Sequence, residues 1–173
     1  SSHDDTGYLT PTGKLVGALP VGIALGRLIA YGVQLGVGND AAKLAIALTQ
    51  PKSPFRIASP IVHTDPTVYN DIVKTIFLSS HEFDNGQYSE PLMLLNLLYE
   101  WRQLRTERER ERWAYHAGVV YARMRYFDSA SSHLCSKLQQ FIHKSFLNLF
   151  LILKHLKFFE HHYRKQFYQF VSC

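Results

Sequence analysis

The feature that most constrains this chain is a predicted helix starting at Val21, whose apolar residues cover most faces instead of a single stripe. A helix of that kind has to be buried, so other helices must surround it. Each glycine inside such a helix costs about 1 kcal/mol relative to alanine. We therefore expect its glycines to permit close approach by neighbouring helices; they are Gly22, Gly26, Gly32 and Gly36.

Residues that start and stop helices surround this segment. Pro20 is predicted to open the apolar helix, because a missing N–H costs least at the first helical position. A second helix rich in small residues follows, with Asn39 or Asp40 as its N-cap. It should end before Pro51 and Pro54, because the residue before a proline is pushed out of helical geometry.

Three more helices are predicted downstream. An amphipathic helix over 67–79 follows Pro66, and a surface connection ends at the Asn85-Gly86 turn. A regular apolar spacing predicts a helix over 91–104, and another is expected from Asp128 or Ser129 to Ile142. The alternating charges of 105–112 favour a solvated helical face over a dedicated RNA-binding stripe. Together these segments predict an all-α fold, a helical bundle of six or seven helices.

The positive charge of the chain is confined to its C-terminal end. Residues 1–136 hold 13 Lys and Arg against 13 Asp and Glu, whereas residues 137–173 hold six against one. Six minus one accounts for the whole net charge of +5. Phosphate binding depends on local positive groups, so composition gives no support for RNA binding by the body of the domain.

The tail, residues 144–173, contains no glycine or proline, and its apolar run over 146–153 is too short to span a bilayer. Three interpretations stay open. The tail is an amphipathic helix packed on the domain, a basic interfacial or partner-binding helix, or a non-native extension without a selected role. Metal binding through His155, His161 and His162 is disfavoured, because adjacent histidines point to different helix faces.

Two blocks of the sequence carry a family resemblance. The first is LTPTGKLVGALPV followed by AAKLAIALTQPKSPF, and the second is LMLLNLLYEW followed by WAYHAGVVYARMR. In this order they resemble the C-terminal helicase-associated region of DEAH/RHA-type ATP-dependent RNA helicases, in which the end of a winged helix leads into a ratchet-like helical domain. The chain departs from that pattern at Gly22 and Ala114, where the family usually has aspartate and cysteine, and its tail does not match the β-rich continuation.

The resemblance implies a division of the chain and a set of partners. Residues 1–18 would be the end of a winged-helix-like segment with a small β remnant at the N-terminus, and 19–143 the ratchet-like domain. The basic aromatic tail over 144–173 would have no assigned role. Expected partners are single-stranded RNA, the helicase motor domains in cis and a protein partner for the tail. Candidate RNA contacts are basic side chains at helix ends and in loops, with ordinary solvated or packed side chains as the alternative: Lys52, Arg56, Arg102, Arg123 and Arg125.

No catalytic motif is present in the sequence. It lacks a G-x-x-x-x-G-K-[ST] loop, a DEAH tetrapeptide and any supported Ser/His/Asp or Cys/His set. We therefore expect no catalytic residue, cofactor or metal in this chain, with ATP and Mg bound by the motor domains of a larger parent. Cys135 and Cys173 are expected to be free thiols of an intracellular, nuclear or cytoplasmic protein.

Two functions of different classes follow. The first is a non-catalytic accessory domain of a DEAH-box helicase, which helps to form the RNA channel and couples motor cycling to RNA translocation or unwinding. The alternative is a helical protein-interaction module without helicase activity, favoured by the aromatic tail.

Overall fold

A computed structural model describes the backbone of residues 10–170 and the side chains of residues 10–145 and 147. Within this part the chain is an all-α bundle, as predicted, with no strand other than an isolated bridge between Phe55 and Val119. The predicted N-terminal β remnant falls on residues 1–9, outside the described residues. The helices are α1 (Pro11–Ala18), α2 (Ile23–Gln34), α3 (Gly38–Thr49), α4 (Pro66–Asp84), α5 (Glu90–Gln103), α6 (Glu107–His116) and α7 (Tyr121–Phe170).

Helices α1 and α2 form the N-terminal pair, and α2 starts later than predicted. Helix α1 is capped by the Thr10 hydroxyl, which accepts a hydrogen bond from the Gly13 amide at 3.1 Å, and Pro11 occupies its first turn. The prediction that Pro20 opens the next helix is wrong, because α2 begins at Ile23 after an extended Gly22. Leu19 belongs to the link between α1 and α2, and its side chain is buried. Burial of this leucine therefore holds the link between the helices, and the proline precedes the helix without opening it.

Close approach of helices is confirmed for two of the four glycines. A Cβ added to Gly26 would lie 2.8 Å from Val16 Cγ1, and one added to Gly32 would overlap the Cβ of Ala41. Gly22 has open space around it, and Gly36 forms a left-handed turn with φ of +79°. Helices α1, α2 and α3 therefore pack tightly through small residues, as the sequence indicated.

The predicted cap of α3 is wrong, because the helix begins at Gly38 without a side-chain cap and both Asn39 and Asp40 lie inside its first turn. Helix α4 runs five residues past its predicted end at residue 79, with Asp65 as its N-cap. Its extension is held by burial of Phe83. The longer α4 has a tertiary cause, since burial decides how far a marginal helix continues.

The chain turns between α4 and α5 at Asn85, which has φ of +50°, and at Gly86 with φ of +72°. The Asn85-Gly86 turn was predicted correctly. Helix α6 opens with a reciprocal capping box, in which Thr106 and Glu109 satisfy each other's backbone amides. The alternating charges after Thr106 therefore lie on a mainly exposed helix, as expected for a solvated face.

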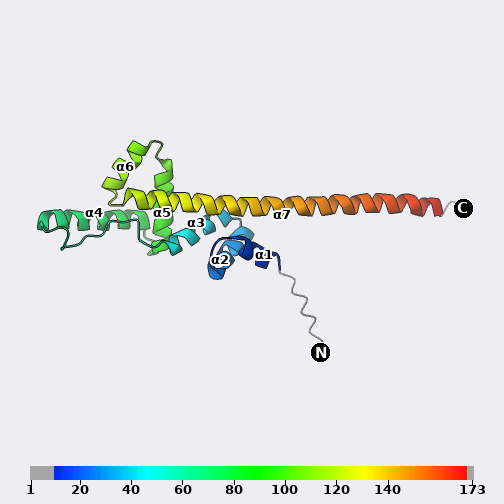
Figure 1. Cartoon of the computed structure of the whole chain (residues 1–173), viewed down its shortest axis with the longest axis horizontal. Helices are drawn as coiled ribbons and strands as arrows, with labels where there is room; N and C mark the ends of the chain where they lie inside the picture. The colour runs from blue at the N-terminus through cyan, green and yellow to red at the C-terminus, as the bar shows by residue number, and fades with distance from the viewer. Residues whose placement is uncertain (1–9, 171–173) are drawn as a thin grey trace, which may run out of the picture.

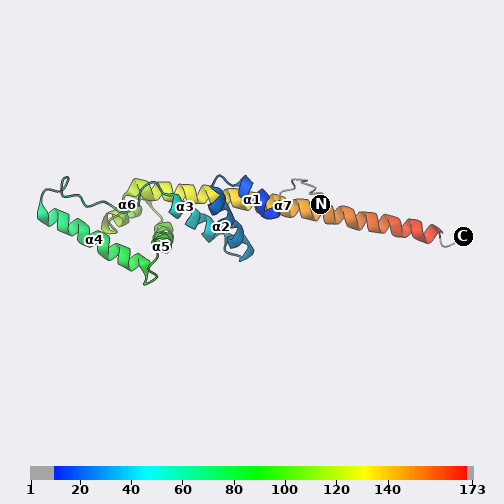
Figure 2. The same cartoon turned by 90° about the horizontal axis from the view of Figure 1, so that it is seen from below.

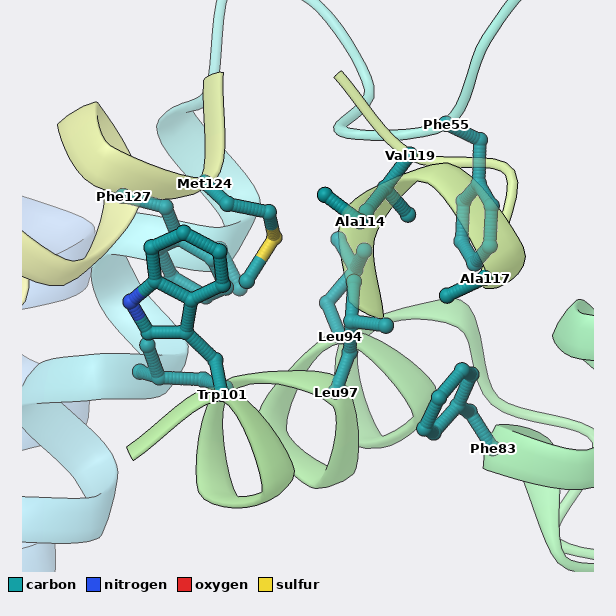
Figure 3. Close-up of a cluster of buried hydrophobic side chains, with 12 residues drawn as sticks. Phe55, Phe83, Leu94, Leu97, Trp101, Ala114, Ala117, Val119, Met124 and Phe127 are labelled. Atoms are coloured by element: carbon teal, nitrogen blue, oxygen red, sulfur yellow. The ribbon is translucent and has the colours of Figure 1, made fainter. Parts of the chain in front are cut away.

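Two hydrophobic clusters form the core. The Trp101 cluster joins α3, α4, α5, α6 and α7, and Figure 3 shows Trp101 packed against Met124 and Phe127. The Ile29 cluster joins α1, α2, α3 and a later stretch of α7 around Leu134 and Leu138. Helix α7 runs along both clusters, so one helix connects the two halves of the body.

Helix α7 is the longest element and differs most from the prediction. It begins at Tyr121, seven residues before the earliest predicted start, because Met124 and Phe127 are fully buried in the Trp101 cluster. It continues unbroken to Phe170, and its C-terminal half extends away from the body (Figures 1 and 2). The predicted tail helix is thus a continuation of α7, while its side-chain interactions fall largely outside the described residues, as do the side chains of the three histidines for which metal binding was disfavoured. No described helix has the length and apolarity needed to cross a bilayer.

Candidate nucleic-acid interface

The five basic residues expected to contact RNA occupy different environments. Arg102 lies between α5 and α7, where its Nε donates to Asp128 Oδ1 at 2.7 Å. Its Nη2 donates to Ser132 Oγ at 3.0 Å, and Trp101 Nε1 donates to the same aspartate at 3.1 Å. The guanidinium of Arg102 therefore joins two helices through hydrogen bonds within the protein.

Arg123 is also engaged within the fold. Its Nη1 donates to the Ser53 carbonyl at 2.9 Å and to the Phe55 carbonyl at 3.1 Å. This arginine holds the loop after α3 against the start of α7. Lys52, next to Ser53, is exposed on the same loop. Arg125 is exposed on α7, with its guanidinium 5.9 Å from the ring centroid of Tyr121.

Arg56 stands on the loop that Arg123 fixes. The Arg56 amide donates to the Gly118 carbonyl at 2.8 Å, and the Val120 amide donates to the Pro54 carbonyl at the same distance. These bonds flank the bridge between residues 55 and 119 and tie the loop to the joint between α6 and α7. The backbone of Arg56 is therefore fixed, while its side chain is left to face a cleft.

That cleft, named here the Arg56 cleft, has a volume of about 490 Å³ and lies between the 56–63 loop, α4 and the end of α6. The Arg56 guanidinium sits 5.0 Å from the ring centroid of Tyr115, which is 65% exposed. Gly118 lies in the left-handed region with φ of +64°, and a Cβ there would meet Thr75 Cγ2 at 3.1 Å. The cleft is lined by Arg56, His63, Val68, Asp71, Ile72, Thr75, Tyr115, His116 and Gly118.

The Arg56 cleft combines groups that suit a nucleotide chain. A guanidinium offers planar donors to phosphate oxygens, and an exposed aromatic ring offers a stacking surface for a base. The pairing of Arg56 with Tyr115 is also the cation–π geometry that fixes a guanidinium without consuming its hydrogen-bond donors. Of the five predicted residues, Arg56 is the one placed in this cleft.

A second groove, of about 440 Å³, lies where α7 leaves the body, and a polar network stands at its edge. Asp40 Oδ1 accepts from Tyr99 Oη at 2.6 Å and from Lys43 Nζ at 2.9 Å. The Tyr99 hydroxyl, followed by Lys43, holds the pKa of Asp40 below its ordinary value of 3.8. Burial raises the pKa of Tyr99 above 10.0. The three groups satisfy one another, so they act as a clamp between α3 and α5.

Cys135 is a free thiol, as predicted, and it lies half-buried on α7. Burial raises the pKa of this thiol, and its Sγ donates weakly to the Asn39 carbonyl at 3.5 Å. A thiol with a raised pKa is a poor nucleophile, so the position suits packing. Cys173 lies outside the described residues.

Tyr115 and His116 were not predicted as site residues, although both lie inside the second block of family resemblance. Tyr115 lies two residues after the partly buried Trp113, and the helical period places Tyr115 on a different face from Trp113. The available signal was a second aromatic residue after Trp113 on a helix that opens with six alternating charges. What the sequence lacked was the neighbour, because Arg56 lies 59 positions earlier and reaches Tyr115 only through the fold.

Part of this chain is similar in sequence to a known protein. No family model matches this chain. Human ATP-dependent RNA helicase DHX29 is 28% identical to it over 123 residues, which is 71% of this chain and 8% of that protein. The chain therefore spans only a small part of the length of this relative. The similarity supports a region related to an RNA helicase.

Proposed function

We propose that this chain is a non-catalytic accessory domain of a DEAH-box ATP-dependent RNA helicase. In this role it helps to form the RNA channel and couples the motor cycle to RNA translocation or unwinding. The proposal rests chiefly on the similarity to DHX29 over 123 residues. The all-α fold and the lack of a nucleotide-binding motif agree with a part that works beside a motor.

Within this function we assign the RNA contact to the Arg56 cleft. The Arg56 side chain faces an open cleft beside an exposed aromatic ring. Arg102 and Arg123 instead donate hydrogen bonds to other groups of the protein. Lys52 and Arg125 are exposed and stay as secondary candidates. A single-stranded RNA would place a phosphate on Arg56 and stack a base on Tyr115.

Binding of a fluorescent oligouridine, measured by anisotropy at several salt concentrations, tests the contact. Base stacking on one aromatic side chain is worth about 1–3 kcal/mol, so Tyr115→Ala should weaken binding by roughly 5- to 150-fold. Arg56→Ala should weaken binding as well and reduce the salt slope by about one ion. Arg27→Ala is the matched control, because Arg27 is exposed on α2, away from the lining of the cleft. Equal affinities for all three variants and the wild type would refute the assignment.

Exchange of the matching region in DHX29 tests the accessory role. The 123 residues would be replaced by those of this chain, and RNA-stimulated ATP hydrolysis would be compared with a deletion of the same region. We expect the exchange to retain stimulation that the deletion loses. Hydrolysis of ATP by the 173-residue chain alone would contradict a non-catalytic role.

A helical protein-interaction module is the second candidate, and one observation favours it. The C-terminal half of α7 extends from the body, and no other described element lies beside it (Figures 1 and 2). A chain ending at His143 keeps the buried Leu134 and Leu138 of the Ile29 cluster, and a thermal melt would verify that it folds. Pull-down with and without residues 144–173 then separates the candidates. Loss of every partner with unchanged RNA binding would favour the interaction module.

A further inference from the structure

The Arg56 cleft is close to electrically neutral when its imidazoles are uncharged. Among its lining residues Arg56 carries one positive charge and Asp71 one negative charge. The other titratable residues of the lining are Tyr115, His63 and His116. Imidazoles are the side chains that gain charge between pH 8 and 5, so protonation of both would take the cleft from about 0 to about +2.

Both imidazoles are held at the cleft by defined elements of the fold. His116 lies in the last turn of α6, and the C-terminal end of a helix attracts cations. His63 Nδ1 lies 3.1 Å from the Ser59 carbonyl, to which it donates when it carries a proton, and 3.4 Å from the Ser59 amide, from which it accepts when it does not. The loop therefore holds the ring through Nδ1 in either tautomer, and the charged imidazole carries an N–H at both nitrogens.

Charged groups near the histidines do not cancel this gain. Asp65 is two residues from His63, but its carboxylate caps α4 by accepting from the Thr67 amide at 2.8 Å. Glu111 and Arg112 lie one turn before Tyr115 and His116 on α6, and their charges are of opposite sign. Asp71 is the one acid in the lining, and Arg56 already balances it.

We infer that the Arg56 cleft is a phosphate-binding site that requires charged imidazoles. His63 and His116 supply the positive charge for a phosphodiester, and Arg56 and Tyr115 orient the nucleotide. RNA binding by this domain therefore strengthens as pH falls. The inference rests on the proposed function, because it takes the anion to be an RNA phosphate.

The test measures the dissociation constant of a fluorescent oligouridine at pH 8.0 and 5.5, at fixed ionic strength, for the 173-residue chain. Uridine and phosphodiester groups keep their charge over this interval, so any change comes from the protein. A unit charge about 4 Å away in water contributes roughly five-fold, so two imidazoles should tighten binding roughly 20-fold on acidification. The test variant is His63→Asn with His116→Asn. The matched control is His81→Asn with His133→Asn, two exposed histidines on α4 and α7 that do not line the cleft.

We expect oligouridine binding to strengthen equally on acidification for the wild type and the control variant, and not to strengthen for the test variant. Equal tightening in all three proteins would overturn it, because the effect would then belong to the overall charge. Binding that depends on Arg56 but not on pH would overturn the inference and leave the proposed RNA contact intact. Acid-strengthened binding that needs both histidines but survives Arg56→Ala would support the phosphate site and refute the assigned role of Arg56.

Discussion

Removal of the Arg102 side chain distinguishes a structural arginine from an RNA contact. Its guanidinium makes a 2.7 Å charge-assisted bond to Asp128 and a 3.0 Å bond to Ser132. The side chains of Arg102 and Asp128 are 29% and 21% exposed, so solvent screens the pair only in part. Hydrogen bonds to charged groups contribute about 1.5–3 kcal/mol each, and allowing for that screening we expect Arg102→Ala to lower the free energy of unfolding by about 2–3 kcal/mol.

The partner gives the second arm of a double-mutant cycle. Asp128→Ala removes the same ion pair and also leaves Trp101 Nε1, on a fully buried side chain, without its 3.1 Å acceptor. A buried unsatisfied donor costs about 1–3 kcal/mol, so this variant should be destabilised at least as much as Arg102→Ala. The double variant should lose less than the sum, with a coupling energy of about 1–2 kcal/mol.

Urea denaturation followed by circular dichroism measures the unfolding free energies, and oligouridine anisotropy measures binding by each folded variant. The expected result is a large loss of stability for Arg102→Ala with unchanged RNA affinity. Surface substitutions usually change stability by less than about 0.5 kcal/mol. A change that small, together with a clear loss of RNA affinity, would refute the structural assignment of Arg102.

Two further predictions concern the helix packing and the polar clamp. Gly32→Ala should destabilise the protein by about 1–2 kcal/mol in urea denaturation, because overpacking against Ala41 outweighs the gain in helix propensity. Gly17→Ala, in open space, should stabilise it by about 0.5–1 kcal/mol, and equal effects of the two changes would contradict the packing argument. The lowered pKa of Asp40 means that its stabilisation is present above the unfolded pKa and lost as pH falls through the lower folded value. Tyr99→Phe should therefore reduce the loss of stability below about pH 4 in acid titrations, whereas an unchanged profile would exclude this hydrogen bond as its source.

The helices were predictable because their information is local. The apolar positions of α2 and α5 recur at helical spacing, and α4 ends at the local turn signal Asn85-Gly86. The ends of the helices were less predictable, since α4 and α7 both extend into stretches whose helical state depends on burial. Met124 and Phe127 show this directly, because contacts of the Trp101 cluster begin α7 before the local signal at Asp128.

The candidate site, like the helices, was predictable from the sequence only in part. Sequence alone determined that this chain is an all-α bundle with an apolar, glycine-bearing helix near its start and no catalytic motif, and that basic residues at loops were worth testing. Those properties follow from side-chain chemistry and spacing within single segments. Only the tertiary structure decided which arginine is available, because hydrogen bonds to Asp128 and to two loop carbonyls occupy Arg102 and Arg123. It also brought Arg56 to Tyr115, since a contact across 59 positions depends on how the helices pack and not on any local pattern.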